Sequence, residues 1–152
     1  MEKKPFVTKE QLEEIVKEYP TPFHLYDEKG IRENVKELYD AFSWNKGYKE
    51  YFAVKATPNP FLINILREYG CGCDCSSYTE LMLSDAIGAT GEDIMFSSND
   101  TPAEEFVLAD KLNAIINLDD ITHIDFLEEA IGHIPETISC RYNPGGMFKI
   151  SN

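Results

Sequence analysis

Apolar positions along the chain alternate between strand-like runs and helix-like spacings. From Tyr51 onward, short apolar runs typical of buried strands are followed by segments whose apolar residues lie three or four positions apart. The pattern predicts strands at 51–55, 71–76, 94–98, 114–118 and 137–142, and helices at 60–69, 78–87, 102–111 and 120–132. Short connections rich in Gly, Asp, Asn and Pro separate them. This alternation predicts βαβ units and a parallel sheet.

Two further helices are predicted ahead of the first strand. Residues 8–19 form a short amphipathic pattern that begins with the capping-box pair Thr8 and Gln11. Residues 28–43 carry apolar side chains at helical spacing. Between the two helices, residues 21–27 include two prolines and predict an extended segment.

Five predicted parallel strands leave two architectures open. They could form a complete five-stranded doubly wound domain, which needs about this length. They could instead be the first five units of a (β/α)8 barrel, which takes about 250 residues. Residues 142–152 follow the fifth predicted strand without a helical pattern or a charged tail, as if the chain stopped within a loop. The strand and helix pattern by itself favours the doubly wound domain slightly.

The composition is that of a globular protein with a strong acidic excess. Of the 152 residues, 43% are hydrophobic and 27% are charged, and the formal net charge is −13. This charge disfavours binding to nucleic acid or to an anionic membrane surface. No apolar run approaches the ~20 residues of a membrane span, and the first residues lack the apolar core of a secretion signal. We therefore expect a cytoplasmic protein.

Lys55 ends the first predicted strand, and Pro58 and Pro60 break the pattern directly after it. The carboxyl ends of parallel strands are where α/β proteins bind ligands and where barrels place catalytic residues. Alternation puts Tyr51, Ala53 and Lys55 on one side, and Ala53 leaves room for a flat ring. A lysine at a strand end is most often solvated. We expect Lys55 to face inward and to be shielded from water; such a lysine has a lowered pKa and can supply the amine of a Schiff base.

The segment 71–76, Cys-Gly-Cys-Asp-Cys-Ser, is the second stretch with candidate chemistry. Alternation places its three cysteines on one face and Asp74 on the other. We expect the cysteines to pack outward against helices, and Asp74 to point inward, where a buried charge needs a partner. Cys-x-Cys-x-Cys lacks the two-residue gap typical of zinc-binding pairs, so no metal site is predicted. With Cys140 far away in the sequence, the set fits a reducing compartment better than a disulfide framework.

Two capping-box sequences predict helix starts. Ser77 with Glu80 precedes one helix, and Thr101 with Glu104 precedes another that has a proline at its first position. These structural roles account for all four residues. Asn59, which is followed by a proline suited to the first helical position, predicts a further helix start.

Arg141 ends the fifth predicted strand and is the expected partner of Asp74. Asp119 or Asp120, which follows the fourth strand, is accounted for as a helix cap. Lys55, Asp74 and Arg141 would then be three polar residues that face inward at the carboxyl ends of different strands.

Three segments together resemble the fold-type III pyridoxal-phosphate decarboxylases, particularly diaminopimelate decarboxylase, a family with an alanine racemase-like barrel. Residues 51–56, Tyr-Phe-Ala-Val-Lys-Ala, are similar to the family's Tyr-Ala-Val-Lys-Ala-Asn, and residues 71–80 are similar to its Phe-Asp-Cys-Ala-Ser form. Residues 141–145, Arg-Tyr-Asn-Pro-Gly, resemble its Arg-(Val/Tyr)-Asn-Pro-Gly. The loop 97–100, Ser-Ser-Asn-Asp, departs from the family's commoner His-Gly-Asn-Asn-Lys, and no cofactor contact is assigned to it.

The resemblance implies an incomplete (β/α)8 barrel of the TIM type, with about five parallel strands, over residues 28–152. Residues 1–27 would form an N-terminal helix and an edge strand of a second, β-rich domain. The implied cofactor is pyridoxal 5'-phosphate, carried by Lys55 as the catalytic amine, with Asp74 and Arg141 beside its ring.

The implied reaction is the decarboxylation of meso-diaminopimelate to L-lysine in a homodimeric enzyme. Much of the family's machinery belongs to later strands, so we expect these 152 residues alone to be inactive. A decarboxylase of ornithine, arginine or carboxynorspermidine, or a related racemase, remains open because the substrate-side residues also lie later. A non-enzymatic α/β module, in which Lys55 only ends a strand, is the alternative of another class.

Overall fold

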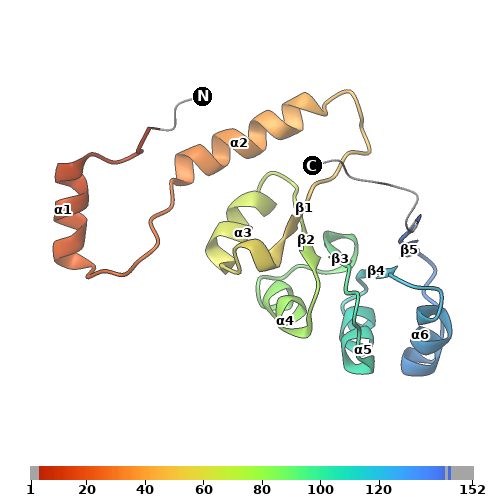
Figure 1. Cartoon of the computed structure of the whole chain (residues 1–152). Coiled ribbons are helices and arrows are strands. Elements are labelled where there is room, and N and C mark those ends of the chain that lie inside the picture. Colours follow the sequence, from red (N-terminus) through yellow and green to blue (C-terminus); the bar gives the residue numbers. More distant parts are fainter. Residues whose placement is uncertain (1–3, 143, 145–152) are drawn as a thin grey trace.

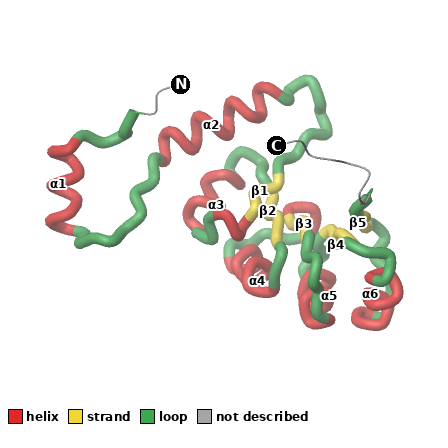
Figure 2. Tube along the Cα trace, in the orientation of Figure 1, coloured by secondary structure: helices red, strands yellow, loops and turns green. Residues whose placement is uncertain are grey.

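The computed structural model describes residues 4–142 and residue 144 (Figure 1). Figure 2 marks helices, strands and loops along the same trace. The helices are α1 (Lys9–Glu18), α2 (Glu28–Ala41), α3 (Pro60–Arg67), α4 (Tyr78–Ala86), α5 (Ala103–Lys111) and α6 (His123–Ile131), with short 3-10 helices η1 (Val54–Ala56) and η2 (Gly91–Asp93). The strands are β1 (Tyr51–Ala53), β2 (Gly72–Cys75), β3 (Ile94–Phe96), β4 (Ile115–Leu118) and β5 (Ile138–Cys140). Every predicted helix and every strand predicted from Tyr51 onward is present, and most are slightly shorter than expected.

The strands form one parallel sheet in chain order, β1-β2-β3-β4-β5. In this sheet Ala53 pairs with Asp74, Asp74 pairs with Met95, and Asn117 pairs with Ser139. A doubly wound domain reverses its strand order and carries helices on both faces. Here the order does not reverse, and α3 to α6 follow one side of the sheet (Figure 1). The predicted incomplete barrel is therefore confirmed, with an open sheet in the described part, and the doubly wound alternative is wrong.

The hydrophobic core lies between the sheet and helices α3 to α6. Strand residues that face the helices are buried, and each large apolar side chain removed from water contributes about 1.5–3 kcal/mol. The largest fully buried apolar side chains are Phe96, Phe106, Ile63, Leu81, Ile94, Ile116 and Leu127. Because this side of the sheet supplies the core, the opposite side is available for polar residues.

The starts of α1, α3 and α4 have the predicted caps. Thr8 and Gln11 form a reciprocal capping box at α1. Asn59 caps α3 ahead of Pro60, and the Ser77 hydroxyl accepts a backbone hydrogen bond from the first turn of α4. These local signals fix where the connections end and where the helices begin.

The predicted capping box at α5 is wrong. Pro102, with an extended backbone, takes the capping position, so the helix begins at Ala103 and no side chain caps it. This later start moves Thr101 one residue too far from the helix for its hydroxyl to cap the first turn. Glu104 is exposed on the first turn instead.

The N-terminal segment makes few contacts with the sheet. Helix α1 buries none of its residues and lies apart from the strands (Figure 1). Residues 19–27 contain no strand in this structure, and the edge strand of a second domain stays a prediction. The proposed boundary after residue 27 stays a prediction. Within the described residues, no helix combines the length and apolarity needed to cross a bilayer.

Candidate active site

The two faces of the sheet differ in chemistry. One face packs on the helices, and the other, called here the inner face, carries half-buried residues that are polar toward the carboxyl ends of the strands. Its members are Tyr51, Ala53, Asp74, Met95, Ser97, Ile115, Asn117 and Ser139. Since the carboxyl ends of parallel strands meet at one edge, this edge is where candidate chemistry collects.

Lys55 lies just past β1, within the 3-10 turn Val54–Ala56. Val54 is fully buried and anchors the turn, whereas the Lys55 side chain is exposed. Among the described residues, no hydrogen bond or ion pair engages its amine. The expected shielding of Lys55 from water is therefore wrong for this structure. The reason is that β1 is an edge strand, with β2 on one side and, among the described residues, no strand on the other.

Asp74 faces the inner side of β2, as predicted, and is half-buried. The hydroxyl of Ser97 donates a hydrogen bond to its Oδ1 at 2.5 Å. The backbone N–H of Ser97 also donates to the carbonyl of Cys75 at 2.8 Å, which holds Ser97 beside β2. Sequence reasoning missed Ser97. Alternation from Met95, which pairs with Asp74, could have placed Ser97 on the inner face.

Arg141 does not pair with Asp74. Its Nη1 atom donates to Oδ1 of Asp119 at 2.7 Å, across the adjacent strands β4 and β5. Two strands separate β5 from β2, and with about 4.8 Å between neighbouring strands this places them roughly 14 Å apart. The predicted Asp74–Arg141 pair is therefore wrong in this structure. The local capping-type hydrogen bonds belong to Asp120, which accepts from Thr122, and not to Asp119.

The cysteines of β2 pack outward as predicted. Cys71, Cys73 and Cys75 are buried, and the Cys75 sulfur lies 3.1 Å from the Ser84 hydroxyl. Burial raises the pKa of all three thiols, that of Cys75 to about 12. Protonated thiols are poor nucleophiles and poor metal ligands at neutral pH. In the described part of the chain, no group of three or more His, Cys, Asp or Glu side chains is placed to hold a metal ion.

Two carboxylates occupy the N-terminus of α4, beside the carboxyl end of β2. Glu80 accepts hydrogen bonds from the Ser76 backbone and from the hydroxyls of Ser76 and Ser77. Glu105, from α5, accepts the backbone N–H of Tyr78 at 2.8 Å. The positive end of this helix is therefore already neutralised by the chain's own acidic groups.

Tyr51 closes the opposite end of the inner face. Its ring lies over Gly72, where an added Cβ would come within 2.6 Å of the ring. The Tyr51 hydroxyl donates to the carbonyl of Glu92 at 2.7 Å, and burial raises the pKa of this phenol. Only a glycine at position 72 admits this close approach of the Tyr51 ring.

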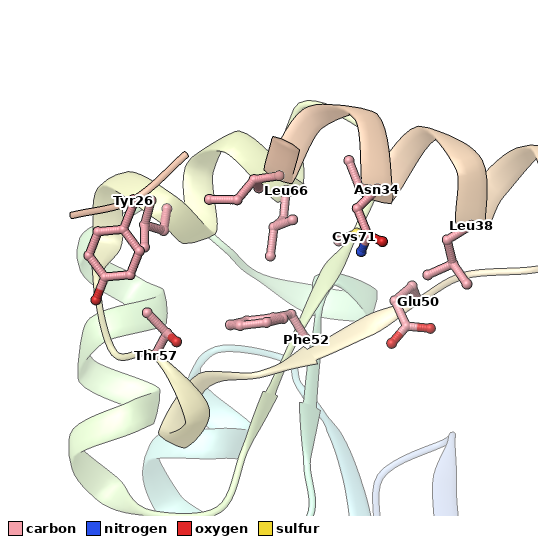
Figure 3. A pocket seen from close by; sticks show the side chains of 11 residues that line it. Tyr26, Asn34, Leu38, Glu50, Phe52, Thr57, Leu66 and Cys71 are labelled. Carbon is pink, nitrogen blue, oxygen red and sulfur yellow. The ribbon is translucent and has the colours of Figure 1, made fainter. Parts of the chain in front are cut away.

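A groove of about 420 Å³ lies on the other side of β1, between α2 and α3 (Figure 3). Phe52 faces it, and strand alternation directs Phe52 away from its neighbour Ala53. Its lining is mainly apolar: Tyr26, Ile31, Asn34, Val35, Leu38, Glu50, Phe52, Thr57, Leu62, Leu66 and Cys71. The sheet separates this groove from Asp74, so we assign the candidate chemistry to the inner face.

Comparisons with known proteins agree with this arrangement. The family model described as pyridoxal-dependent decarboxylase, pyridoxal binding domain, matches residues 28–147. Protein TabA of Pseudomonas amygdali pv. tabaci is 39% identical over 141 residues, which are 93% of this chain and 32% of that protein. A diaminopimelate decarboxylase of Thermoplasma acidophilum is 31% identical over 134 residues, 88% of this chain and 32% of that protein.

A solved structure shares the fold. The diaminopimelate decarboxylase of Helicobacter pylori complexed with L-lysine superposes with a TM-score of 0.71 and 29% identity. The match covers 78% of this chain and 30% of that one. The chain thus spans about a third of the length of the relatives it matches.

Proposed function

The chain belongs to the family of pyridoxal-dependent decarboxylases, and from this premise we propose that it forms part of an enzyme that decarboxylates meso-diaminopimelate to L-lysine. Relatives named diaminopimelate decarboxylase in several organisms support this substrate, as does the lysine bound to the Helicobacter pylori enzyme. The proposed cofactor is pyridoxal 5'-phosphate, the group for which the family's binding domain is described.

The observation that carries the proposal is the position of Lys55. Its primary amine lies at the carboxyl edge of the sheet, one residue past the buried anchor Val54, and no described residue engages it. On the neighbouring strand, Asp74 pairs with the small residue Ala53, which lies two residues before Lys55. A free amine, a carboxylate and space for a flat ring are a donor set that fits the aldehyde and ring of this cofactor.

We assign the following roles to the chain's own residues. Lys55 would hold the cofactor through its aldehyde group, as the amine to which the cofactor is attached. Asp74 orients the ring and balances positive charge on it. Arg141 lies at the same edge, held by Asp119, where its guanidinium can bind an anionic group. When bound, the cofactor accepts the electron pair left by carbon dioxide.

The activity of the complete enzyme is part of the proposal, because the chain covers about a third of its relatives. We expect the 152-residue chain alone to bind the cofactor and to release no appreciable carbon dioxide. We also expect the complete enzyme to be a homodimer.

The test is chemical trapping of the cofactor. Pyridoxal 5'-phosphate is added to the purified chain, borohydride fixes it to the amine that holds it, and peptide mapping locates the label. We expect the label on Lys55 and its loss in Lys55→Arg. Lys111→Arg, a change of the same type on the exposed end of α5, is the matched control and should retain it. Label scattered over surface lysines without preference for Lys55 would count against the proposal.

The same assay on the complete enzyme addresses the substrate, because the residues that contact the substrate are expected in later strands. A substrate amine that displaces Lys55 protects it from the label, so the concentration that halves labelling ranks candidate substrates. We expect meso-diaminopimelate to protect at a lower concentration than ornithine or arginine. The reverse order would move the assignment to another decarboxylase of the family while leaving the role of Lys55 intact.

A further inference from the structure

We propose that Ser97 is a positioning residue for Asp74 and sets how that carboxylate meets the cofactor. This inference rests on the proposed function, and it concerns a loop in which the sequence departs from the pattern of the family it resembles. The hydrogen bond between the Ser97 hydroxyl and the Asp74 carboxylate links the ends of β2 and β3.

The backbone geometry places Ser97 where its hydroxyl can reach the Asp74 carboxylate. Met95 pairs with Asp74 in the sheet, and Ser97 lies two residues further on the same face, one step closer to the carboxyl edge. Its N–H donates to the carbonyl of Cys75 at 2.8 Å, so the backbone of Ser97 is held beside β2. The next residue, Ser98, turns to the other face and is buried.

The hydrogen bond itself is short and directed at one oxygen. Ser97 Oγ donates to Asp74 Oδ1 at 2.5 Å, the distance expected of a hydroxyl bound to a charged carboxylate. Among the described residues, no second hydrogen bond reaches Asp74. With Oδ1 occupied, the orientation of the carboxyl group is set and Oδ2 remains available to a ligand at the carboxyl edge.

Charge around Asp74 explains why a neutral donor matters here. Arg141 is engaged by Asp119, and in the described chain no cation lies within ion-pair distance of Asp74. A half-buried carboxylate without a cation depends on hydrogen bonds for its compensation. Ser97 supplies that compensation before any cofactor binds, so Asp74 is oriented in advance.

The test compares cofactor affinity among serine variants on the inner face. Ser97→Ala removes the hydroxyl, and Ser97→Thr retains it. Ser139→Ala is the matched control, because Ser139 is also a half-buried inner-face serine whose hydroxyl donates to a neighbouring strand, at Asn117. Absorption titration with pyridoxal 5'-phosphate gives the dissociation constant, and borohydride labelling of Lys55 gives the occupied fraction.

We expect Ser97→Ala to weaken cofactor binding about tenfold, as loss of a hydrogen bond to a charged group does. Ser97→Thr and Ser139→Ala should stay within about twofold of the unaltered protein. In an Asp74→Asn background the effect of Ser97→Ala should disappear, because Ser97 acts through that carboxylate. If Ser97→Ala instead weakened binding by destabilising the fold, its effect on cofactor affinity would persist in that background. Thermal unfolding of each variant monitors the stability of the fold.

Two results separate the inference from the proposed function. Labelling of Lys55 that is as strong in Ser97→Ala as in the unaltered protein would overturn the role of Ser97 alone. An undiminished effect of Ser97→Ala in the Asp74→Asn background would overturn it as well. Absence of Lys55 labelling in the unaltered protein would instead count against the proposed function. The carboxyl carbon resonance of Asp74, which should shift in Ser97→Ala without cofactor, then decides whether the bridge exists.

Discussion

Individual buried thiols contribute to the response of the chain to high pH. Burial holds the pKa of Cys75 at about 12, against an ordinary value of 9.0, and raises those of Cys71 and Cys73 as well. Between pH 9 and 12 an unfolded thiol loses its proton while the folded Cys75 keeps it. The unfolded state therefore binds fewer protons, and stability falls as pH rises, by up to about 1.4 kcal/mol per pH unit for each thiol.

We therefore predict that the contribution of these thiols to the free energy of unfolding changes little below pH 8 and declines above pH 9. Urea unfolding at several pH values measures it. Cys75→Ala should lower stability at all pH values through the cavity it leaves, but it should make the alkaline decline shallower. Cys140→Ser, at the exposed cysteine, should leave the slope unchanged. Equal slopes in Cys75→Ala and the unaltered protein would contradict the assignment to Cys75.

The ion pair of Arg141 is a second feature that depends on individual residues. We predict that a double-mutant cycle for Arg141 and Asp119 gives a coupling of about 0–1 kcal/mol, because both side chains are partly exposed. The cycle for Arg141 and Asp74 should give a value near zero. Chemical denaturation of the Ala and Asn variants supplies both numbers. A larger coupling of Arg141 to Asp74 than to Asp119 would show that the predicted pair forms in solution after all.

Strand alternation was sufficient to place side chains on a face but not to pair them. Period-2 alternation alone put Asp74 inward and the three cysteines outward, and both placements hold. The pairing of Arg141 required the number of strands between two positions and the curvature of the sheet, which no local pattern contains. The sequence pattern placed Lys55 at the carboxyl edge of the sheet. The exposure of Lys55, however, depends on whether another strand lies beside β1, and this is a property of the assembled sheet.

At the scale of elements, helix α4 is capped from its neighbour. Glu105 belongs to α5 but accepts the N–H of Tyr78, the first residue of α4, and only 9% of its surface is exposed. Its second oxygen, Oε2, is buried and has no hydrogen-bond partner in the described part of the chain. A buried carboxylate is kept in this position by one charge-assisted hydrogen bond and by the positive end of the helix.

We predict that Glu105→Ala lowers the free energy of unfolding by about 1–3 kcal/mol, the cost of leaving a buried backbone donor unpaired. Glu105→Gln, which retains an acceptor, should cost less. Glu104→Ala is the matched control, since Glu104 precedes it on the same turn but is exposed. Urea denaturation compares the three. An equal effect of Glu104→Ala and Glu105→Ala would contradict a specific cap.

The helix boundaries show where element prediction succeeds and where it stops. Caps formed by residues adjacent in sequence, as at Thr8, Asn59 and Ser77, were found because the signal is local. At α5 the local signal of Thr101 was overridden by Pro102, and the cap from Glu105 to α4 joins residues 27 positions apart. A contact of that range follows from packing of the two helices and has no sequence pattern.

At the scale of the whole molecule, the sheet is open and has two free edges in the described part of the chain. Strands β1 and β5 each have a neighbour on one side only, and their unpaired backbone groups can pair with another strand. Beside β1 lies the apolar groove of about 420 Å³ between α2 and α3 (Figure 3). An unpaired edge next to exposed apolar surface favours association, whereas the net charge of −13 opposes it.

We therefore predict that the 17.3 kDa chain associates, with an average mass that rises with protein concentration. Salt should strengthen association because it screens the repulsion between acidic copies. Light scattering coupled to size-exclusion chromatography measures the mass. Leu62→Glu places a charge in the groove and should shift the distribution toward monomer. Phe61→Glu, on the exposed side of the same helix at 81% exposure, tests whether any lost apolar side chain has that effect. Equal shifts in the two variants, or a monomer at every concentration and salt level, would contradict association through the open edge and its groove.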